Sequence, residues 1–249
     1  MNLTNNDILN VLYTKRPVSI TRIGDGENIV LKSNESLQSY RTCIDNVMTR
    51  QMGYEPTMSE VNEIRENLIR AYGGADIVGV PMHKNLDTLG KHWTSVQETV
   101  EPFCTSDKRT STDVFYDLLY TGELIEWFKS QHTINYIGCR DIDDGFSRLG
   151  VKTVNSFLIA PEAKFTSGYT GDKHYPDQFN KMEWWMNAAP CEGNACLVGA
   201  GVIGKIYCNW FRDRGGIAID AGAVIDLLAG FRTRGPERGL DAVDKRWKI

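Results

Sequence analysis

The chain has 249 residues, of which 41% are hydrophobic and 24% are charged, as is ordinary for a globular protein with its own core. Its formal net charge is −4 with both signs scattered along the sequence, which argues against nucleic-acid binding, since that needs a clustered basic face. Without a signal-peptide pattern, a C-x-x-C pair or a run of about 20 apolar residues, we expect a cytoplasmic protein with reduced cysteines and no membrane span.

Strand-length apolar runs alternate with helix-length amphipathic segments from the N-terminus onward. The first strand is expected at residues 17–22, and a glycine-rich turn follows it. Thr57 and Glu60 match a capping box, in which the two side chains bond free amides at the start of a helix. The apolar face of that helix is Val61, Ile64, Leu68 and Ala71, and Gly73-Gly74 ends it.

The rest of the chain continues this alternation. A strand is expected at 75–81, helical stretches at 86–103 and 114–128, further strands at 133–138 and 153–159, and a final strand, helix and strand at 195–198, 202–212 and 216–219. Continuous β-branched runs between helices predict an α/β fold with a mainly parallel sheet and helices on both faces. Because no repeat or linker interrupts the pattern, we expect one Rossmann-like domain spanning 1–249.

Two acidic residues, Asp25 and Glu27, follow the first predicted strand. The two carboxylates are separated by one residue on a flexible, glycine-containing turn, so both can face a single hard cation such as Mg²⁺ or Mn²⁺. Such a cation accepts substrate phosphates alongside one or two carboxylates. Arg22, just before them, could donate to a phosphate or to a ribose-side group. Asp-Gly is also common turn chemistry, so an ordinary turn is the alternative.

A second motif, Gly199, Gly201 and Gly204 in G-x-G-x-x-G spacing, lies between a predicted strand and a predicted helix. Its backbone amides could approach a diphosphate at the positive end of the helix. Asp220 closes the next strand about twenty residues on, where a dinucleotide-binding fold keeps its ribose-binding acid. Tight packing of the strand against the helix, without any ligand, is the alternative.

Together the two motifs resemble the GT-D glycosyltransferases, a family first catalogued as a bacterial domain of unknown function. Arg-x-Gly-Asp-Gly-Glu at 22–27, Val-Gly-Ala-Gly-x-x-Gly-Lys at 198–205 and Ile-Asp-x-Gly at 219–222 carry the resemblance. It implies a Rossmann-like sheet in which Asp25 and Glu27 are the metal-binding and catalytic Asp-x-Glu pair that engages the diphosphate of a UDP-sugar. The residues that it assigns to donor binding are Arg22, Gly199, Gly201, Lys205 and Asp220.

We therefore expect a metal-dependent glycosyltransferase that uses Mn²⁺ or Mg²⁺ and moves a sugar from a nucleotide-diphosphate sugar to a glycan or glycoprotein acceptor. The alternatives are an NAD(P)- or SAM-binding enzyme built on residues 199–204, and a non-catalytic glycan-binding protein of the same fold. The glycine-rich motif follows one of the last strands instead of the first, and only about thirty residues follow Asp220, which favours the glycosyltransferase. The sugar, the acceptor, the general base and the oligomeric state are not indicated.

Weaker signals lie between the two motifs. Asp141 and Asp143 follow the central strand. Either could be a second metal ligand or a base, but acidic residues in this position more often cap the next helix. The unpatterned stretch 161–178 is expected to be a functional loop, whose segment 170–176 could supply donors to the leaving diphosphate. Of the tryptophans at 184–185, one is expected in the core and the other could stack on a sugar. The histidines expected to be structural or surface groups are His83, His92 and His132.

Overall fold

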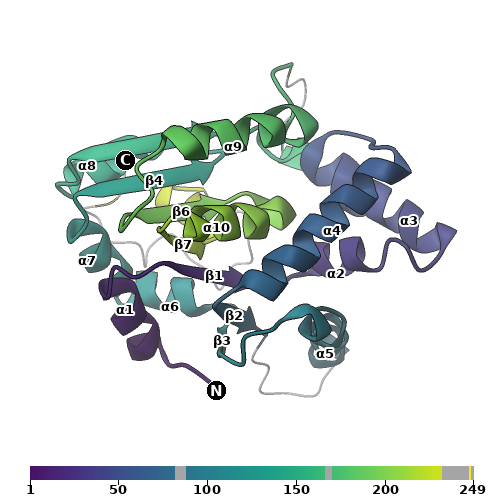
Figure 1. The fold of residues 1–249 in the computed structure, drawn as a ribbon, viewed down its shortest axis with the longest axis horizontal. Helices are drawn as coiled ribbons and strands as arrows, with labels where there is room; N and C mark the ends of the chain where they lie inside the picture. The colour runs from purple at the N-terminus through teal and green to yellow at the C-terminus, as the bar shows by residue number, and fades with distance from the viewer. Residues whose placement is uncertain (82–87, 166–169, 232–246, 248–249) are drawn as a thin grey trace.

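The computed structural model describes residues 1–81, 88–165, 170–231 and Trp247, which form a single α/β domain around one sheet (Figure 1). The sheet has seven strands in the order β3-β2-β1-β7-β6-β4-β5, and every pairing is parallel. The strands are β1 Val18–Arg22, β2 Ile77–Val80, β3 Arg109–Ser111, β4 Thr133–Gly138, β5 Thr153–Leu158, β6 Ala195–Gly199 and β7 Ile217–Asp220. The predicted parallel sheet is thus confirmed, and the short edge strand β3 is an addition that the sequence pattern did not predict.

The central strands are buried on both faces, which explains their continuous apolar runs. Ile20 of β1 is in register with Ile77 of β2 and with Ile219 of β7, and these three side chains share one hydrophobic cluster. Cys196 and Ala218, also in register, belong to the cluster on the other face. The sheet register therefore sorts alternate side chains into two cores.

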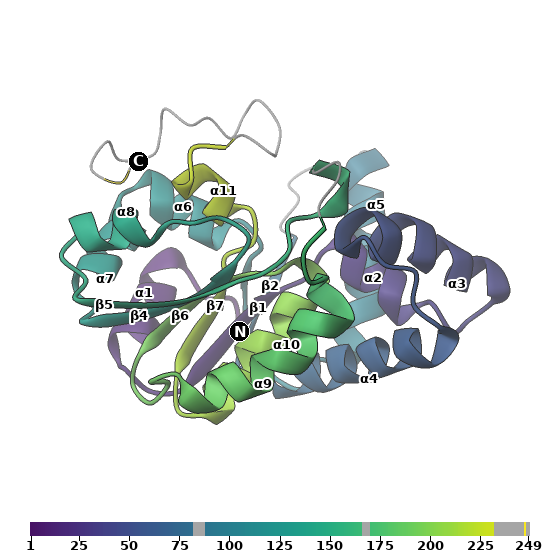
Figure 2. The ribbon, with the colours of Figure 1, turned by 90° about the horizontal axis from the view of Figure 1, so that it is seen from above.

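Helices cover both faces of the sheet (Figure 2). One face carries α4 Met58–Gly74, α9 Phe179–Ala188 and α10 Gly204–Asp213; the other carries α1 Asn5–Tyr13, α6 Val114–Tyr120, α7 Glu123–Lys129, α8 Asp143–Arg148 and α11 Val224–Leu228. Near the carboxyl ends of β1 and β2 lie α2 Asp25–Leu31, α3 Leu37–Cys43, the π-helix η1 Ile44–Met52 and α5 Thr88–Val100. The remaining short turns are η2 Glu101–Phe103, η3 Ala163–Phe165, η4 His174–Gln178 and η5 Gly201–Ile203.

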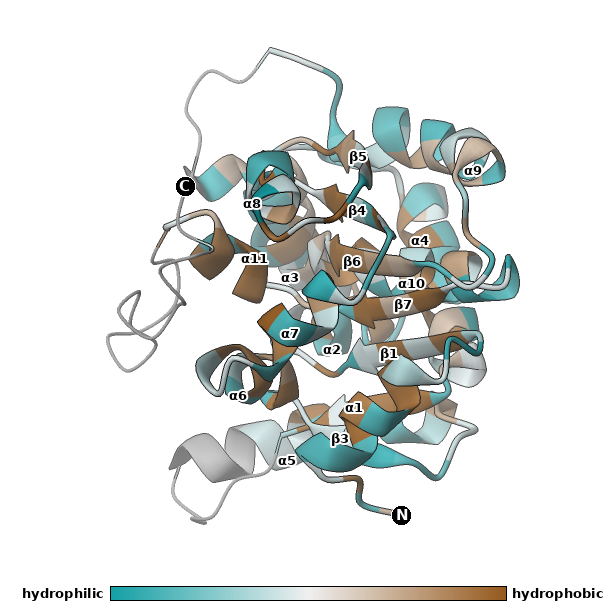
Figure 3. Cartoon of the chain, turned by 90° about the vertical axis from the view of Figure 1, so that its left-hand side faces the viewer, coloured by the Kyte–Doolittle hydropathy of each residue, from teal (hydrophilic) through white to brown (hydrophobic). Residues whose placement is uncertain are grey.

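Helix α4 shows how the sequence pattern becomes structure. The Thr57 backbone N–H donates to Glu60 Oε2 at 2.7 Å, and the Glu60 N–H donates to Thr57 Oγ1 at 3.3 Å, so the predicted capping box is confirmed. The four predicted apolar positions of this helix are buried. Figure 3 shows the same arrangement across the molecule, with hydrophobic residues concentrated in the strands and polar residues on the outward sides of several helices.

Three predicted elements differ from the structure. Gly122, with a φ of +83° that favours glycine, separates α6 from α7, so the predicted single helix at 114–128 is two helices. The predicted turn at Asp25 is instead the first turn of α2. The expected loop 161–178 contains the short helical turns η3 and η4.

The cysteines and the described helices agree with expectation. All six cysteines are free. Among the helices that the structure describes, none is long and apolar enough to cross a membrane.

Candidate functional site

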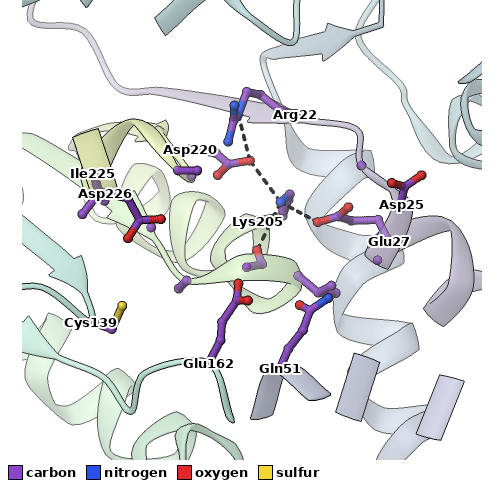
Figure 4. A pocket seen from close by; sticks show the side chains of 18 of the residues that line it. Arg22, Asp25, Glu27, Gln51, Cys139, Glu162, Lys205, Asp220, Ile225 and Asp226 are labelled. Atoms are coloured by element: carbon purple, nitrogen blue, oxygen red, sulfur yellow. Dashed lines mark hydrogen bonds and ion pairs between the residues drawn. The ribbon is translucent and has the colours of Figure 1, made fainter. Parts of the chain in front are cut away.

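A pocket of about 630 Å³ opens at the carboxyl edge of the sheet (Figure 4). Its lining includes residues that end or follow each of the seven strands, because parallel strands bring their carboxyl ends to one edge. This edge is where open α/β sheets bind ligands, and the volume lies in the usual range for small-molecule sites. Asp25 and Gly201 both line the pocket, so the two sequence motifs meet in one place.

The carboxylates of Asp25 and Glu27 differ in environment. Gly24 is the N-cap of α2, and a Cβ atom there would lie 2.6 Å from Glu27 Oε2. Asp25 is exposed at the pocket wall, whereas Glu27 is only 3% exposed. Both lie in the first turn of a helix, where the positive end of the helix dipole stabilises negative charge.

Lys205 of α10 lies at the centre of a buried charge cluster formed by Arg22, Glu27, Lys205 and Asp220. Its Nζ is 2.5 Å from Glu27 Oε1, 3.1 Å from Asp220 Oδ2 and 3.1 Å from the Gly201 carbonyl oxygen. An ammonium has three donors, and here three oxygens surround it. Burial alone would lower the pKa of Lys205, but Asp220 and Glu27 raise it above its usual value, so the side chain is charged.

Arg22 joins this cluster from the end of β1. Its Nε is 3.5 Å from Asp220 Oδ2, and its Nη1 donates to the Thr112 carbonyl oxygen at 3.1 Å. A Cβ on Gly222 would lie 1.8 Å from Arg22 Nη2, so the guanidinium occupies space that only a glycine leaves open. Arg22 is therefore fixed from three directions.

Asp220 lines the pocket but is almost fully buried, at 1% exposed. Burial raises the pKa of its carboxyl, but the cations of Lys205 and Arg22 outweigh this effect and keep the pKa below its usual value. Its Oδ2 faces both cations. This position suits an internal counter-ion and disfavours the ribose contact that a dinucleotide-binding site requires of its acid.

The three glycines of the second motif serve different purposes. A Cβ on Gly199 would lie 2.2 Å from Ile225 Cδ1, and one on Gly204 would lie 3.3 Å from Val198 Cγ1, so both sites are shaped by packing. Gly201 has a φ of +54° and lines the pocket. Residues 199–202, which lead into α10, line the pocket, and phosphate binding by this loop stays a prediction.

Several pocket residues were missed by sequence reasoning. Arg140 and Glu162 follow β4 and β5, and their positions after predicted strands could have identified them. The Arg140 Nε donates to Asp226 Oδ1 at 3.0 Å, and its guanidinium carbon lies 4.1 Å from the centre of the Phe231 ring. Gln51 comes from η1, for which no pattern was recognised.

Other predicted residues lie away from the pocket surface. The Asp143 N–H donates to Asp141 Oδ1 at 3.3 Å in the turn that leads into α8, whose N-cap Ile142 has no side-chain cap bond. Neither Asp141 nor Asp143 lines the pocket, which gives no support to a role for them as metal ligand or base. Trp184 is 75% exposed outside the pocket, while the ring of Trp185 packs edge-on against Phe157.

The histidines are structural or peripheral where they are described. His174 lines the pocket but is largely buried, with Nε2 3.1 Å from the Tyr207 hydroxyl, and burial lowers its pKa to about 4. The imidazole is therefore neutral near pH 7, which is a poor match to the expected donor for a leaving diphosphate. His132 is exposed, as expected. His83, the side chain of His92 and residues 166–169 of the expected loop lie outside the described residues.

The charges and the oxygen atoms of the pocket determine whether it could bind a divalent cation. The described residues that line the pocket include four basic and six acidic side chains, a formal balance of −2. No group of three or more metal-binding side chains occurs in the part of the chain that the structure describes. Asp25 and Glu27 nevertheless offer the hard oxygen atoms that fit Mg²⁺ or Mn²⁺ when ligand phosphates complete the coordination.

Comparisons with known proteins agree with this geometry. A family model described as a GT-D fold-like domain matches residues 3–138, more than half of the chain. A selenomethionine-substituted structure of domain of unknown function 1792 is similar, with a TM-score of 0.57 and 12% identity over 98% of this chain and 90% of that one. A second structure, described as showing that this domain "has a distinct glycosyltransferase fold", gives a TM-score of 0.55 with the same identity and coverage. A search of curated proteins found no match.

Proposed function

Since the chain belongs to the family of GT-D fold-like domains and has a glycosyltransferase fold, we propose that it is a metal-dependent glycosyltransferase. The donor is a nucleotide-diphosphate sugar, in our proposal a UDP-hexose, and the acceptor is a glycan or glycoprotein. The observation that carries this proposal is a pocket in which Asp25 and Glu27 meet the glycine-rich loop before α10, from the opposite end of the chain. The six free cysteines suit a reducing compartment, so we propose a cytoplasmic location.

The pocket charge supports a requirement for Mn²⁺ or Mg²⁺. A nucleoside diphosphate brings at least two negative charges into a pocket whose own formal balance is −2. Such a ligand is repelled unless cations accompany it, and the basic groups Lys205 and Arg22 are already paired with Glu27 and Asp220. Asp25 and Glu27 would hold the cation, which, when bound, stabilises the leaving diphosphate.

The chain itself supplies binding and orientation. Residues 199–202, which lead into α10, line the pocket, and phosphate oxygens are favoured near the positive end of a helix. The buried charge cluster holds Arg22 and Glu27 in fixed positions on either side of Lys205. Preorganised groups of this kind need not rearrange as charge develops on the departing phosphate.

The alternative of an NAD(P)- or SAM-binding enzyme is less well supported. Such a site needs an acid that accepts ribose hydroxyl groups at the end of the strand after the glycine motif. Asp220 has that place in the sequence, but its carboxylate is turned to Lys205 and Arg22. We therefore keep the glycosyltransferase as the proposal.

Calorimetric titration of UDP with and without Mn²⁺ tests the proposal, with NAD as the comparison ligand. We expect UDP to bind with Mn²⁺ and to lose its affinity when EDTA is added, while NAD gives no heat. Ligand at a hundred times its Kd should also raise the free energy of unfolding by about 2.7 kcal/mol. Binding of NAD that is indifferent to EDTA would refute the proposal, and UDP binding without any donor hydrolysis or transfer would indicate a non-catalytic protein.

A further inference from the structure

The six acidic side chains of the pocket differ in what they face. Asp25 and Glu27 begin α2 and form the proposed cation site. Asp220 is paired with Lys205 and Arg22, and Asp226 is paired with Arg140 at 3.0 Å. This leaves Asp113 and Glu162 as carboxylates whose roles neither the charge cluster nor the cation site explains.

Glu162 is aimed into the middle of the pocket. In Figure 4 its carboxylate extends from the wall that faces Lys205 and the α10 loop, with Glu27 and Asp25 to one side and Cys139 and Asp226 to the other. Its side chain is 29% exposed, so it can exchange protons with a ligand or with solvent. The ammonium of Lys164 lies 2.5 Å from Glu162 Oε2 and orients the carboxylate.

The backbone that carries Glu162 is well anchored. Glu162 comes four residues after the end of β5, and the Ala160 N–H between them donates to Gln178 Oε1 at 2.6 Å. Gln178 is itself buried, and Pro161 restricts the backbone directly before Glu162. A carboxylate on such a segment keeps its direction, as a group that must meet a reacting atom has to do.

Asp113 is less well placed for the same task. It lies at the start of α6, and its N–H donates to Ser111 Oγ at 3.0 Å. The preceding residue, Thr112, accepts a hydrogen bond from Arg22. Asp113 therefore lies next to the Arg22 contact at the end of β3. Glu162, in contrast, lies across the pocket from Arg22 and Asp220 (Figure 4).

We propose that Glu162 is the general base that deprotonates the acceptor hydroxyl; this inference rests on the proposed function. The proton moves from the acceptor oxygen to the Glu162 carboxylate. The electron pair of that oxygen forms the bond to the anomeric carbon, and the bond from this carbon to the donor phosphate oxygen breaks with its electrons on the nucleoside diphosphate. A base on the face opposite the leaving group implies a single displacement, so the product has the inverted anomeric configuration.

The variants Glu162→Gln and Glu162→Ala test this assignment. The probe is whichever of UDP-glucose, UDP-galactose and UDP-N-acetylglucosamine the wild type hydrolyses fastest with Mn²⁺, with water as the acceptor. We expect kcat to fall by about 10²–10⁴-fold, the contribution of a general base, while the Kd of UDP with Mn²⁺ changes less than twofold. Melting temperatures should stay near that of the wild type, because the side chain is partly exposed.

Azide gives the sharpest readout, because it is a nucleophile that needs no deprotonation. Added azide should restore donor consumption by Glu162→Ala and yield a glycosyl azide of inverted configuration, but should not speed up the wild type comparably. Asp226→Asn, which alters another pocket carboxylate, serves as the matched control and should show no azide rescue.

Two negative outcomes are distinguishable. If the wild type turns over a donor and Glu162→Gln keeps its kcat within threefold, or if azide rescues Asp226→Asn instead, Glu162 is not the base and the glycosyltransferase proposal stands. If the wild type consumes no donor, the proposed function fails and this inference fails with it.

Discussion

At the scale of single residues, Lys205 changes the meaning of the Asp-x-Glu motif. The motif suggests two equivalent carboxylates, but Lys205 Nζ lies 2.5 Å from Glu27 and leaves Asp25 exposed at the pocket wall. Sequence spacing could identify both acids as pocket residues. It could not predict their unequal burial, because that depends on α10, which reaches Glu27 from the other end of the chain.

Substitution of the two acids should therefore separate stability from binding. Asp25→Asn should leave the free energy of unfolding near the wild-type value while UDP affinity with Mn²⁺ falls at least tenfold. Glu27→Gln should also lower stability by about 3 kcal/mol, because it removes a charged partner from a buried ammonium. Urea denaturation and calorimetric titration measure the two effects. Equal stabilities for the two variants would contradict the inferred burial of Glu27.

A glycine pair tests how tightly Arg22 is fixed. Gly222 and Gly230 both have positive φ, +53° and +80°, so alanine at either site costs about 1 kcal/mol in backbone strain. At Gly222 the new Cβ would also lie 1.8 Å from Arg22 Nη2, whereas at Gly230 it would meet no atom within 4 Å. Gly222→Ala should thus destabilise the protein by about 2 kcal/mol more than Gly230→Ala, because the Arg22–Asp220 pair is broken.

Urea denaturation measures the loss of stability in each alanine variant, and UDP titration shows whether the pocket is disturbed. Gly230→Ala should bind UDP as the wild type does. Equal unfolding free energies for the two alanine variants would mean that Arg22 moves aside without cost.

At the scale of elements, the sequence predicted those helix starts that are fixed by contacts between residues close together in the chain. The capping box of Thr57 and Glu60 fixes the start of α4 through bonds within four residues, so the sequence alone identifies it. Helix α2 has no side-chain cap and packs against α4 and α5, so tertiary contacts decide its conformation. The same holds for η4, whose His174 side chain lies against Tyr207 of α10.

The contact between η4 and α10 should make the protein acid-sensitive. Burial lowers the pKa of His174 to about 4 in the folded state, against 6.5 when it is exposed. Between these values the unfolded chain binds the extra proton, so stability falls as the pH drops from 6.5 to about 4, by about 3 kcal/mol in total. The carboxyl of Asp220, with its lowered pKa, adds a further loss below about pH 3.8.

Urea denaturation at a series of pH values checks this expectation. His174→Asn keeps a polar group near the Tyr207 hydroxyl but cannot titrate, so its stability should change less between pH 6.5 and 4 than that of the wild type. Parallel pH profiles for the two proteins would show that other groups cause the acid sensitivity.

At the scale of the whole molecule, the fold class could be predicted because every central strand is a continuous apolar run flanked by helices. The strand order could not, since pairings such as β1 with β7 join segments almost 200 residues apart, whose register is set by side chains in the two cores. The pocket, too, could be predicted only in part. Sequence reasoning found the acids after β1 and the glycines after β6, but it gave no role to Glu162, which only the assembled sheet edge brings opposite them.

One sheet separating two cores implies cooperative unfolding. Trp127 and Trp247 report on one core, while Trp185 and Trp210 pack against the other, so aromatic signals sample both faces. We expect near-ultraviolet and far-ultraviolet circular dichroism to show one coincident transition in urea, because neither core can be exposed while the sheet stays intact. Two separate transitions would divide the chain into two folding units.

The central place of β7 has a consequence for synthesis on the ribosome. Strands β1 to β3 can pair early, and β6 can join β4 and β5, but these two half-sheets remain separate until residues 217–220 have emerged. Until then β1 and β6 each present an open edge, the kind of surface to which other strands add in aggregation. Entry of β7 closes both edges at once and brings Asp220 to Lys205 and Arg22. The nascent protein therefore acquires its ligand pocket and its protection from misassembly in the same late step.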